Sequence, residues 1–329
     1  MAHNLFRDQM AFVGEAPWHG LGTRVPPGIT SKGMLMGAGL AWEVRKIPAI
    51  GAKVVKGQAS EAIYDRYFLQ RDPVGDEREG PVLGVVGARY EVLQNHEAFG
   101  FFDPFLSAED ARYEAAGALG NGERVWVQVR MGNPIEVADG DAVHRFILLS
   151  NSHDGRGAVS LRFTPIRVVC QNTLNLALDG GDHVVNLRHS KRVRDRLADH
   201  QVEFLLRTVE ATFASAAEQF RRLAGTTATA ERREQYLEAM FPRTKEQQAA
   251  GGIPKWWGGI AEGLADERVT PRKTRDTMWG LYNAVTHAED YRKTTETMPD
   301  ARLERIWFGR GAELKIKALQ TAVQLCEVR

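Results

Sequence analysis

The chain has 329 residues, of which 43% are hydrophobic and 26% are charged. These values are ordinary for a globular protein and exclude bulk disorder, and the length predicts about two domains. The formal net charge of +1 excludes a strongly basic protein, but a total hides how charge is distributed. Residues 156–196 hold 8 Lys and Arg against 3 Asp and Glu, whereas residues 1–155 carry a net charge of −5.

The cysteine content and the apolar runs indicate the compartment. Cys170 and Cys326 are the two cysteines, too few for a disulfide scaffold, which is typical of a reducing compartment. The first residues contain no secretory signal. No apolar run approaches the roughly 18–20 residues of a membrane helix. We therefore expect a cytoplasmic protein without a membrane partner.

The first half of the chain predicts strands and one short helix. Residues 1–39 are rich in Gly and Pro and are expected to be an irregular N-terminal segment. Strand patterns follow at 40–50, 62–70 and 82–86. Asn95 is a suitable cap for a helix that runs to about Leu106. Pro104 is expected to kink this helix or end it early.

Two hairpins and several helices are expected next. Residues 112–118 and 124–131 flank Gly-Asn-Gly, and residues 144–150 and 158–169 flank a second polar turn. Apolar positions spaced near 3.6 residues predict a long helix over 191–223. Further helices are expected at 230–240, 271–291 and 311–328. The fold class is α+β, an antiparallel sheet of hairpins packed on long helices, with a core over 40–225 and a mainly helical region over 226–329.

Signals for catalysis, metals and cofactors are weak. His183 and His189 lie near Cys170, but they lack the spacing of a zinc site and favour exposed loop histidines. Cys170 at a strand-to-helix junction is typical of a small buried residue. The glycines of 117–122 lead into a strand, so they indicate a hairpin rather than a phosphate loop. The paired carboxylates, Asp76 with Glu77 and Asp139 with Asp141, are interpreted as solvated loop charges. No cofactor is indicated.

One strand combines basic and aromatic residues. Because side chains alternate across a strand, Val125, Val127 and Val129 share one face with Met131, and the opposite face carries Arg124, Trp126, Gln128 and Arg130. Basic groups contact phosphates, and an aromatic ring can stack on a base. The alternative is an ordinary polar outer face with Trp126 covered by a helix.

The basic block over 156–196 is the second candidate. Cations near a helix start oppose the helix dipole, and a bound anion would offset that cost. The alternative is a solvated face paired with Asp195, Asp199 and Glu203. The candidate phosphate-binding residues of this block are Arg156, Arg162, Arg188, Lys191, Arg192 and Arg194.

Four motifs resemble one family. They are PWHGLG at 17–22, RVVCQNTL at 167–174, RHS at 188–190 and WGLYNAVT at 279–286. Together they span most of the chain and resemble the phage/plasmid-like proteins classed as domain-of-unknown-function family 932. The resemblance implies a gene carried by mobile genetic elements, and it implies no established activity and no catalytic residues.

A looser, fold-level resemblance is to phage single-strand annealing proteins. The expected order of a helix, two hairpins and a long helix is similar to a small sheet crossed by a long helix, with DNA in a basic groove. No diagnostic annealing motif is present, so this resemblance is an analogy of fold alone.

The sequence therefore supports three hypotheses about function. The first is a non-enzymatic, oligomeric protein that binds and anneals single-stranded DNA in recombination. It would use Arg124, Trp126 and Arg130 together with the six cations of the basic block. The second is a factor that binds a host protein through Trp256, Trp257, Trp279, Trp307 and Phe308, since aromatic residues are enriched at interface hot spots. The third is an enzyme in which His19, with His96 or His153, supplies an acid or base.

Overall fold

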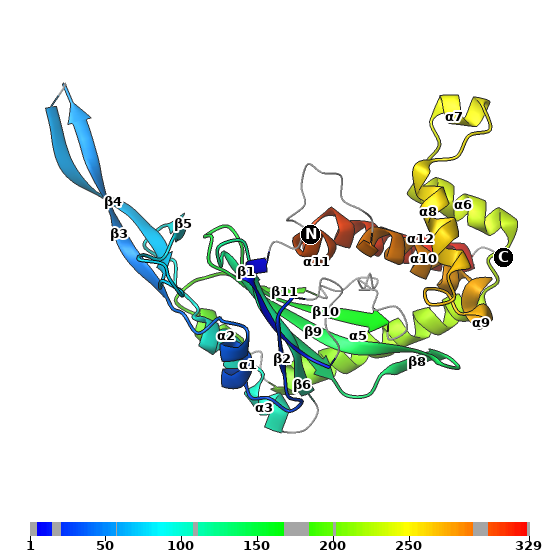
Figure 1. Ribbon diagram of the computed structural model, residues 1–329, viewed down its shortest axis with the longest axis horizontal. Coiled ribbons are helices and arrows are strands. Elements are labelled where there is room, and N and C mark those ends of the chain that lie inside the picture. The colour runs from blue at the N-terminus through cyan, green and yellow to red at the C-terminus, as the bar shows by residue number, and fades with distance from the viewer. Residues whose placement is uncertain are drawn as a thin grey trace.

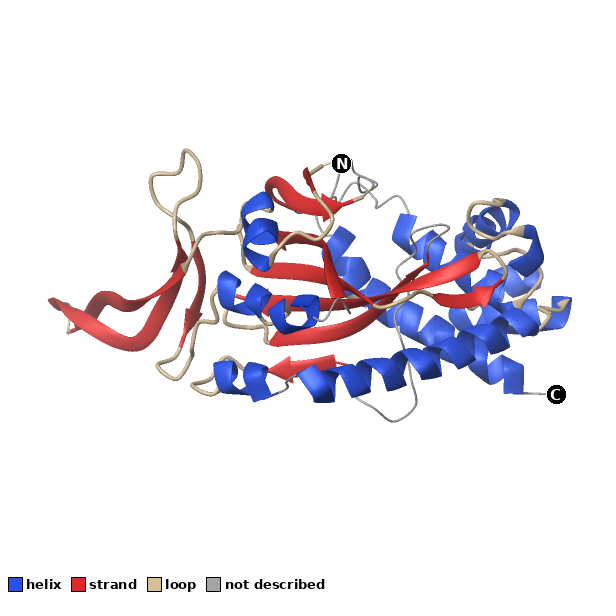
Figure 2. Cartoon of the chain, turned by 90° about the horizontal axis from the view of Figure 1, so that it is seen from below, coloured by secondary structure: helices blue, strands red, loops and turns tan. Residues whose placement is uncertain are grey.

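The computed structural model describes residues 5–14, 21–56, 58–107, 111–167, 184–199, 202–291 and 302–327. The fold is mixed α+β, with antiparallel sheets and a helical C-terminal part (Figures 1 and 2), as the sequence predicts. Most of the motifs at 17–22 and 167–174 lies outside the described residues, because the structure does not describe 15–20 and 168–183. Trp18, His19 and Cys170 are therefore not described.

Within the described residues, eight strands form the main sheet, in the order β11-β10-β9-β7-β6-β1-β2, with β8 paired to β9. All neighbours are antiparallel except β1 and β2. The strands are β1 (Leu5–Val13), β2 (Thr23–Val25), β6 (Ala111–Leu119), β7 (Arg124–Met131), β8 (Ile135–Ala138), β9 (Asp141–Ser152), β10 (Val159–Arg167) and β11 (Val184–Leu187).

The hairpin β6–β7 forms where the sequence predicts it. Gly120 and Gly122 adopt φ values of 65° and 105°, which L side chains rarely adopt, so glycine is needed on both sides of Asn121. The second predicted hairpin, β9–β10, is also present, and its turn is closed by Asp154. Gly120 and Gly122 therefore serve a turn between strands, whereas Gly117 lies within β6.

The main sheet has a helix-covered inner face. There the main core lies between the sheet and α1 (Ser31–Gly37), α2 (Asn95–Gly100), α3 (Asp103–Ser107) and α5 (Val202–Gly225). The opposite face, called the outer face below, meets the short α11 (Arg302–Trp307). Figure 1 shows α1, α3 and α5 below the sheet and α11 above it.

A second sheet forms an arm. It consists of β3 (Val44–Val55), β4 (Gln58–Arg71) and β5 (Val82–Val86), and it projects from one end of the main sheet (Figure 1). Its base packs tightly on the β9–β10 turn, because a Cβ on Gly84 would lie 2.3 Å from the Asp154 carbonyl oxygen.

The C-terminal region is helical where it is described. Trp279 in α10 is fully buried, and its indole nitrogen donates to the Asp141 carboxylate in β9 at 2.9 Å. This bond joins the helices to the main sheet. The remaining helices are α4 (Val193–Asp199), α6 (Ala230–Met240), α7 (Lys245–Ala249), α8 (Lys255–Ala265), α9 (Arg272–Arg275), α10 (Met278–Tyr291) and α12 (Arg310–Glu327).

Three local expectations differ from the structure. The segment 1–39, expected to be irregular, contributes β1, β2 and α1, because pairing with β6 orders a stretch whose own pattern is weak. Asn95 is not the cap of α2: Gln94 takes that place, and the Asn95 amide donates to the carbonyls of Leu40 and Trp42. The helix expected over 191–223 is described as α4 and α5, with 200–201 outside the described residues.

Two of the four carboxylates that the sequence suggests are solvated, Glu77 and Asp141, are instead engaged by other side chains. Glu77 accepts two hydrogen bonds from Arg71, whose side chain is 1% exposed, and its pKa falls to about 2 because of that pairing. Asp141 is buried against Trp279. Asp76 and Asp139 are exposed, as expected, and pair with Arg7 and Lys273. Tertiary contacts decide this difference, because all four residues lie in similar turn sequences.

Candidate nucleic-acid interface

The two faces of β7 are occupied as the alternation predicts. Val125, Val127 and Val129 lie in the main core, together with Met131. The opposite side chains, Arg124, Trp126, Gln128 and Arg130, lie on the outer face. The expected separation of an apolar side and a basic-aromatic side is therefore present in the structure.

Strand register brings distant cations to one end of the main sheet. Arg124 begins β7 opposite Ser152, which ends β9, and Val159 begins β10 opposite Leu187, which ends β11. The turn between β9 and β10 therefore lies at this same end. The cations there, called the basic end below, are Arg124, Arg156, Arg188, Lys191 and Arg192.

Most of the basic end is open to solvent. Arg156 in the β9–β10 turn and Arg188, Lys191 and Arg192 after β11 are exposed, and Arg124 is half-buried. The nearest acidic residue of the turn, Asp154, is engaged locally: one oxygen accepts from the Ser152 hydroxyl and from two backbone N–H groups. Although burial opposes it, this bonding keeps the pKa of Asp154 below its usual value.

Arg162 lies beside the basic end, on the outer face of β10. Both Arg162 and Arg124 lie over the ring of Phe308, with their guanidinium carbons 5.4 and 4.7 Å from the ring centroid. The Arg162 guanidinium also donates to the Trp307 carbonyl at 3.3 Å. Burial lowers the pKa of Arg162, as does the charge of Arg124. The sequence gives no signal that Phe308 would reach these strands, since it lies more than 140 residues from Arg162.

The ring of Trp126 is buried. It is 1% exposed, and Trp307 of α11 crosses it with ring centroids 4.7 Å apart and planes at 75°. A Cβ on Gly117 of β6 would lie 2.9 Å from the Trp126 ring, so glycine provides the space that the ring fills. The alternative expectation, a tryptophan covered by a helix, describes this structure.

Arg130 lies apart from the basic end. It is six residues along β7 from Arg124, which corresponds to about 20 Å of strand. One of its terminal nitrogens lies 2.7 Å from His144 Nε2. Burial lowers the pKa of His144 to about 4, and the charge of Arg130 acts in the same direction. Arg130 is therefore not grouped with the other candidate cations.

Arg194 is held by carboxylates. Its guanidinium lies 2.6 Å from Glu97 and 3.7 Å from Glu91, and it also donates to the Val92 carbonyl. The hydrogen bond to Glu97 is the main cause of the raised pKa of Arg194. Its described ion-pair partners thus belong to the segment around α2, whereas the sequence suggested Asp195, Asp199 and Glu203. Arg194 fastens α4 to that segment.

The residues of the other two hypotheses are placed as follows. His153 is fully buried, and its Nε2 bonds to the Asn95 side chain at 2.9 Å, whereas His96 is exposed. The aromatic residues of the C-terminal region mostly fill the interior: Trp279 and Trp307 are buried. Trp256 and Trp257 are half-buried; Trp256 stacks on Phe241, and Trp257 donates to its carbonyl.

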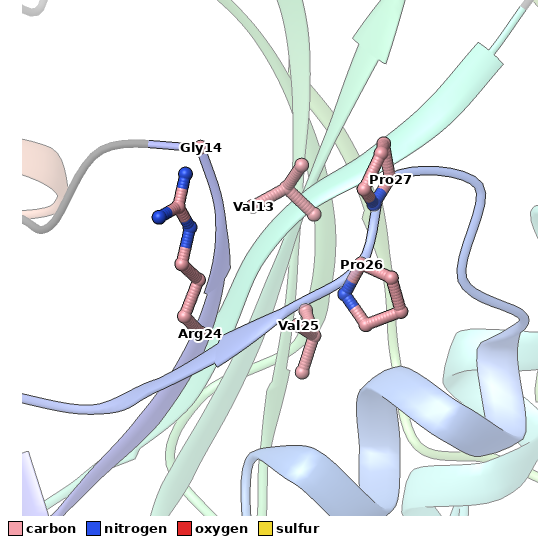
Figure 3. A pocket seen from close by; sticks show the side chains of 6 residues that line it. All are labelled: Val13, Gly14, Arg24, Val25, Pro26 and Pro27. Carbon is pink, nitrogen blue, oxygen red and sulfur yellow. The ribbon is translucent and has the colours of Figure 1, made fainter.

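A cavity of about 510 Å³ lies beside the parallel pair β1–β2. In Figure 3, Arg24 lies on one side of it, across from Val13, Val25 and the two prolines 26 and 27. Among the described residues that line the cavity, Arg24 is the charged one. In the parts of the chain that are described, no group of three or more His, Cys, Asp or Glu side chains is arranged to hold a metal ion. No helix described here is both long and apolar enough to span a membrane.

Comparison with known proteins gives one match. A family model described as a domain of unknown function, DUF932, matches residues 82–307. No curated protein and no solved structure matches the chain. The matched region includes the basic end, the outer-face residues of β7 and β10, and α11, whereas β1 and Phe308 lie outside it. The looser likeness to annealing proteins has no solved structure to support it and stays a prediction.

Proposed function

The chain belongs to the DUF932 family, and we propose that it is a non-enzymatic protein that binds single-stranded DNA, with the basic end of the main sheet as the contact to backbone phosphates. The family description assigns no activity, so the proposal rests on the geometry of this chain. It keeps the phage or plasmid context, the cytoplasmic location and the role in annealing and recombination that the sequence suggests.

One observation carries the proposal. Segments around residues 124, 156 and 188–192 are separate in sequence, and the register of β7, β9, β10 and β11 brings their cations to one end of the sheet. Strands lie about 4.8 Å apart, so the row spans about 14 Å from β7 to β11. Contacts of Arg and Lys to phosphates supply affinity without reading sequence, as annealing requires.

Annealing adds two requirements to binding. The backbone must be neutralised while the bases stay free to pair, and several protomers must line one strand. The basic end meets the first requirement because its exposed side chains are cations rather than rings. A homo-oligomer would meet the second, and it forms part of the proposal.

The test compares a triple variant with a charge-matched control. A fluorescent oligonucleotide of about 30 nucleotides is titrated at about 50 mM salt, where phosphate contacts are strong. Arg188→Gln, Lys191→Gln and Arg192→Gln together are expected to weaken binding at least about tenfold, or about 1.4 kcal/mol. The control carries Lys245→Gln, Lys255→Gln and Arg268→Gln, three exposed cations of the helical region. Absence of binding by the wild-type protein, or an equal loss in the control, would refute the proposal.

Binding of a host protein is the second candidate. The observation that favours it is local: Ile253 is 61% exposed next to the half-buried Trp256 and Trp257. A pull-down that recovers one protein with the wild-type chain, loses it with Ile253→Asp, and contains no nucleic acid would favour this candidate.

A further inference from the structure

Resting on the proposed function, we propose that the outer face of β7 and β10 is a subsite for unpaired nucleobases of single-stranded DNA, and that Trp307 and Phe308 of the same chain occupy this subsite in the present structure. The basic end would hold phosphates, and the neighbouring face would hold two bases after α11 moves aside, while the other bases of the bound strand stay free to pair.

The first evidence is a set of buried N–H donors without acceptors. Four donor nitrogens of this face have no hydrogen-bond partner among the described residues, although Trp126 and Gln128 are only 1% and 6% exposed. A buried polar group without a partner destabilises the fold. The nitrogens are Trp126 Nε1, Gln128 Nε2, Arg130 Nε and Arg162 Nε.

The donors form one patch. Trp126, Gln128 and Arg130 alternate along β7, so these residues follow one another on one face with their Cα atoms about 7 Å apart. Gln128 and Arg162 both pair with Leu148, from opposite sides of β9, so they flank it on that face. Trp307 contacts two members of this group, the Trp126 ring and the Arg162 guanidinium. A ligand on this patch must therefore be rich in acceptors, and nucleobases carry carbonyl and ring-nitrogen acceptors.

The second evidence is the shape of the contacts that α11 makes. Trp307 meets the ring of Trp126 edge to face, and the guanidinium groups of two arginines lie over the ring of Phe308. Flat rings held against aromatic and Arg side chains are what single-stranded nucleic acids present to their binding proteins. Two aromatic side chains of this chain thus occupy positions suited to two flat bases.

The third evidence concerns the segment that covers the face. α11 spans six residues, and a helix of that length is marginal on its own, so tertiary contacts hold it in place. In the described part of α11, the Trp307 carbonyl accepts a hydrogen bond from Arg162, and Arg305 pairs with Glu289 of α10. Displacing such a segment disrupts no strand of the main sheet.

The test separates bases from phosphates. A thymidine oligonucleotide and an abasic strand of equal length carry the same phosphates, but only the first has bases. In the double variant Trp307→Ala, Phe308→Ala, the affinity for the thymidine strand is expected to be about tenfold higher than that of the wild-type protein. Its affinity for the abasic strand is expected to stay within about twofold of the wild-type value. Adding Trp126→Ala is expected to abolish the gain. The single variant Phe308→Ala, at a half-buried site, is expected to show part of the gain if the double variant folds poorly.

The outcomes distinguish this inference from the proposed function. If the wild-type protein binds both strands and the variants gain nothing with thymidine, the base subsite is wrong and phosphate binding stands. An equal gain with both strands also overturns the subsite, because only access to phosphates has then changed. If the folded wild-type protein and the folded variants bind neither strand, both proposals fail.

Discussion

The carboxylate of Glu77 accepts two hydrogen bonds of 2.7 Å from the guanidinium of Arg71. Arg71 ends β4, and its Nε also donates to the Asn121 carbonyl in the β6–β7 turn. The guanidinium lies over the ring of Phe6 in β1, 4.6 Å from the centroid. The side chain of Arg71 therefore joins the base of the arm to β1 and to the β6–β7 turn of the main sheet.

Glu77→Gln should destabilise the fold strongly. The substitution leaves the Arg71 charge buried without its carboxylate, and breaking a buried pair costs about 3 kcal/mol. The free energy of unfolding, measured with denaturant, is expected to fall by that amount. Asp76→Asn is the neighbouring control, because the Asp76 side chain is 91% exposed and exposed pairs contribute about 0.5 kcal/mol. Equal effects of the two variants would contradict the role of the Arg71–Glu77 pair.

His153 should make the protein sensitive to mild acid. Burial lowers the pKa of His153 to about 3, so the folded state keeps it neutral while the unfolded state binds a proton below about pH 6.5. The contribution of His153 to the free energy of unfolding is complete above about pH 6.5. It falls as the pH drops toward about 3, by about 1.4 kcal/mol per pH unit.

The measurement for His153 is the unfolding free energy between about pH 4 and 6. In His153→Gln, the slope of the unfolding free energy against pH is expected to be smaller than in the wild-type protein by about 1.4 kcal/mol per pH unit. His189, whose pKa burial also lowers, continues to contribute in both proteins. Parallel slopes would show that His153 does not titrate between the two states.

The salt dependence of DNA binding should report how many cations of the basic end contact phosphates. Five phosphate contacts to a single strand predict a slope of about −3.5 for log affinity against log salt concentration. Arg188→Gln with Arg192→Gln is expected to reduce its magnitude by about 1.4. Arg194→Gln is a suitable control, because Glu97 and Glu91 already pair with Arg194. A slope unchanged by the double variant would remove these residues from the interface.

Lys315 and Asp290 should be coupled inside the helical region. Their side chains are 0% and 4% exposed, and the ammonium donates to the carboxylate at 2.7 Å. Lys315→Met removes one charge of a buried pair and is expected to cost about 3 kcal/mol. Adding Asp290→Leu is expected to recover part of that loss, because the second buried charge is then gone. A double-variant cycle measures this coupling, and additive losses would contradict it.

Several elements were predictable from the sequence because their signals are local. The β6–β7 turn follows from Gly120 and Gly122, which alone among common residues adopt positive φ readily. The alternation in β7 placed Val125 and Val127 in the core. By contrast, β1 has a weak pattern of its own and becomes a strand through pairing with β6.

The candidate site was predictable only as a set of residue types. Arg124, Arg156, Arg162 and the cations after β11 were identified from charge and alternation. Their partners were not: Arg194 lies 97 residues from Glu97, and Trp126 lies 181 residues from Trp307. Contacts at such separations leave no trace in local periodicity.

The sequence by itself determined the α+β class, the two hairpins and the concentration of positive charge in residues 156–196, because composition, turn residues and periodicity are properties of neighbouring residues. Only the tertiary structure decided which cations face solvent together, since strand register gathers Arg124, Arg156 and Arg188 at one end of the sheet. It also decided that Trp126 is covered, because Trp307 reaches it from the other end of the chain.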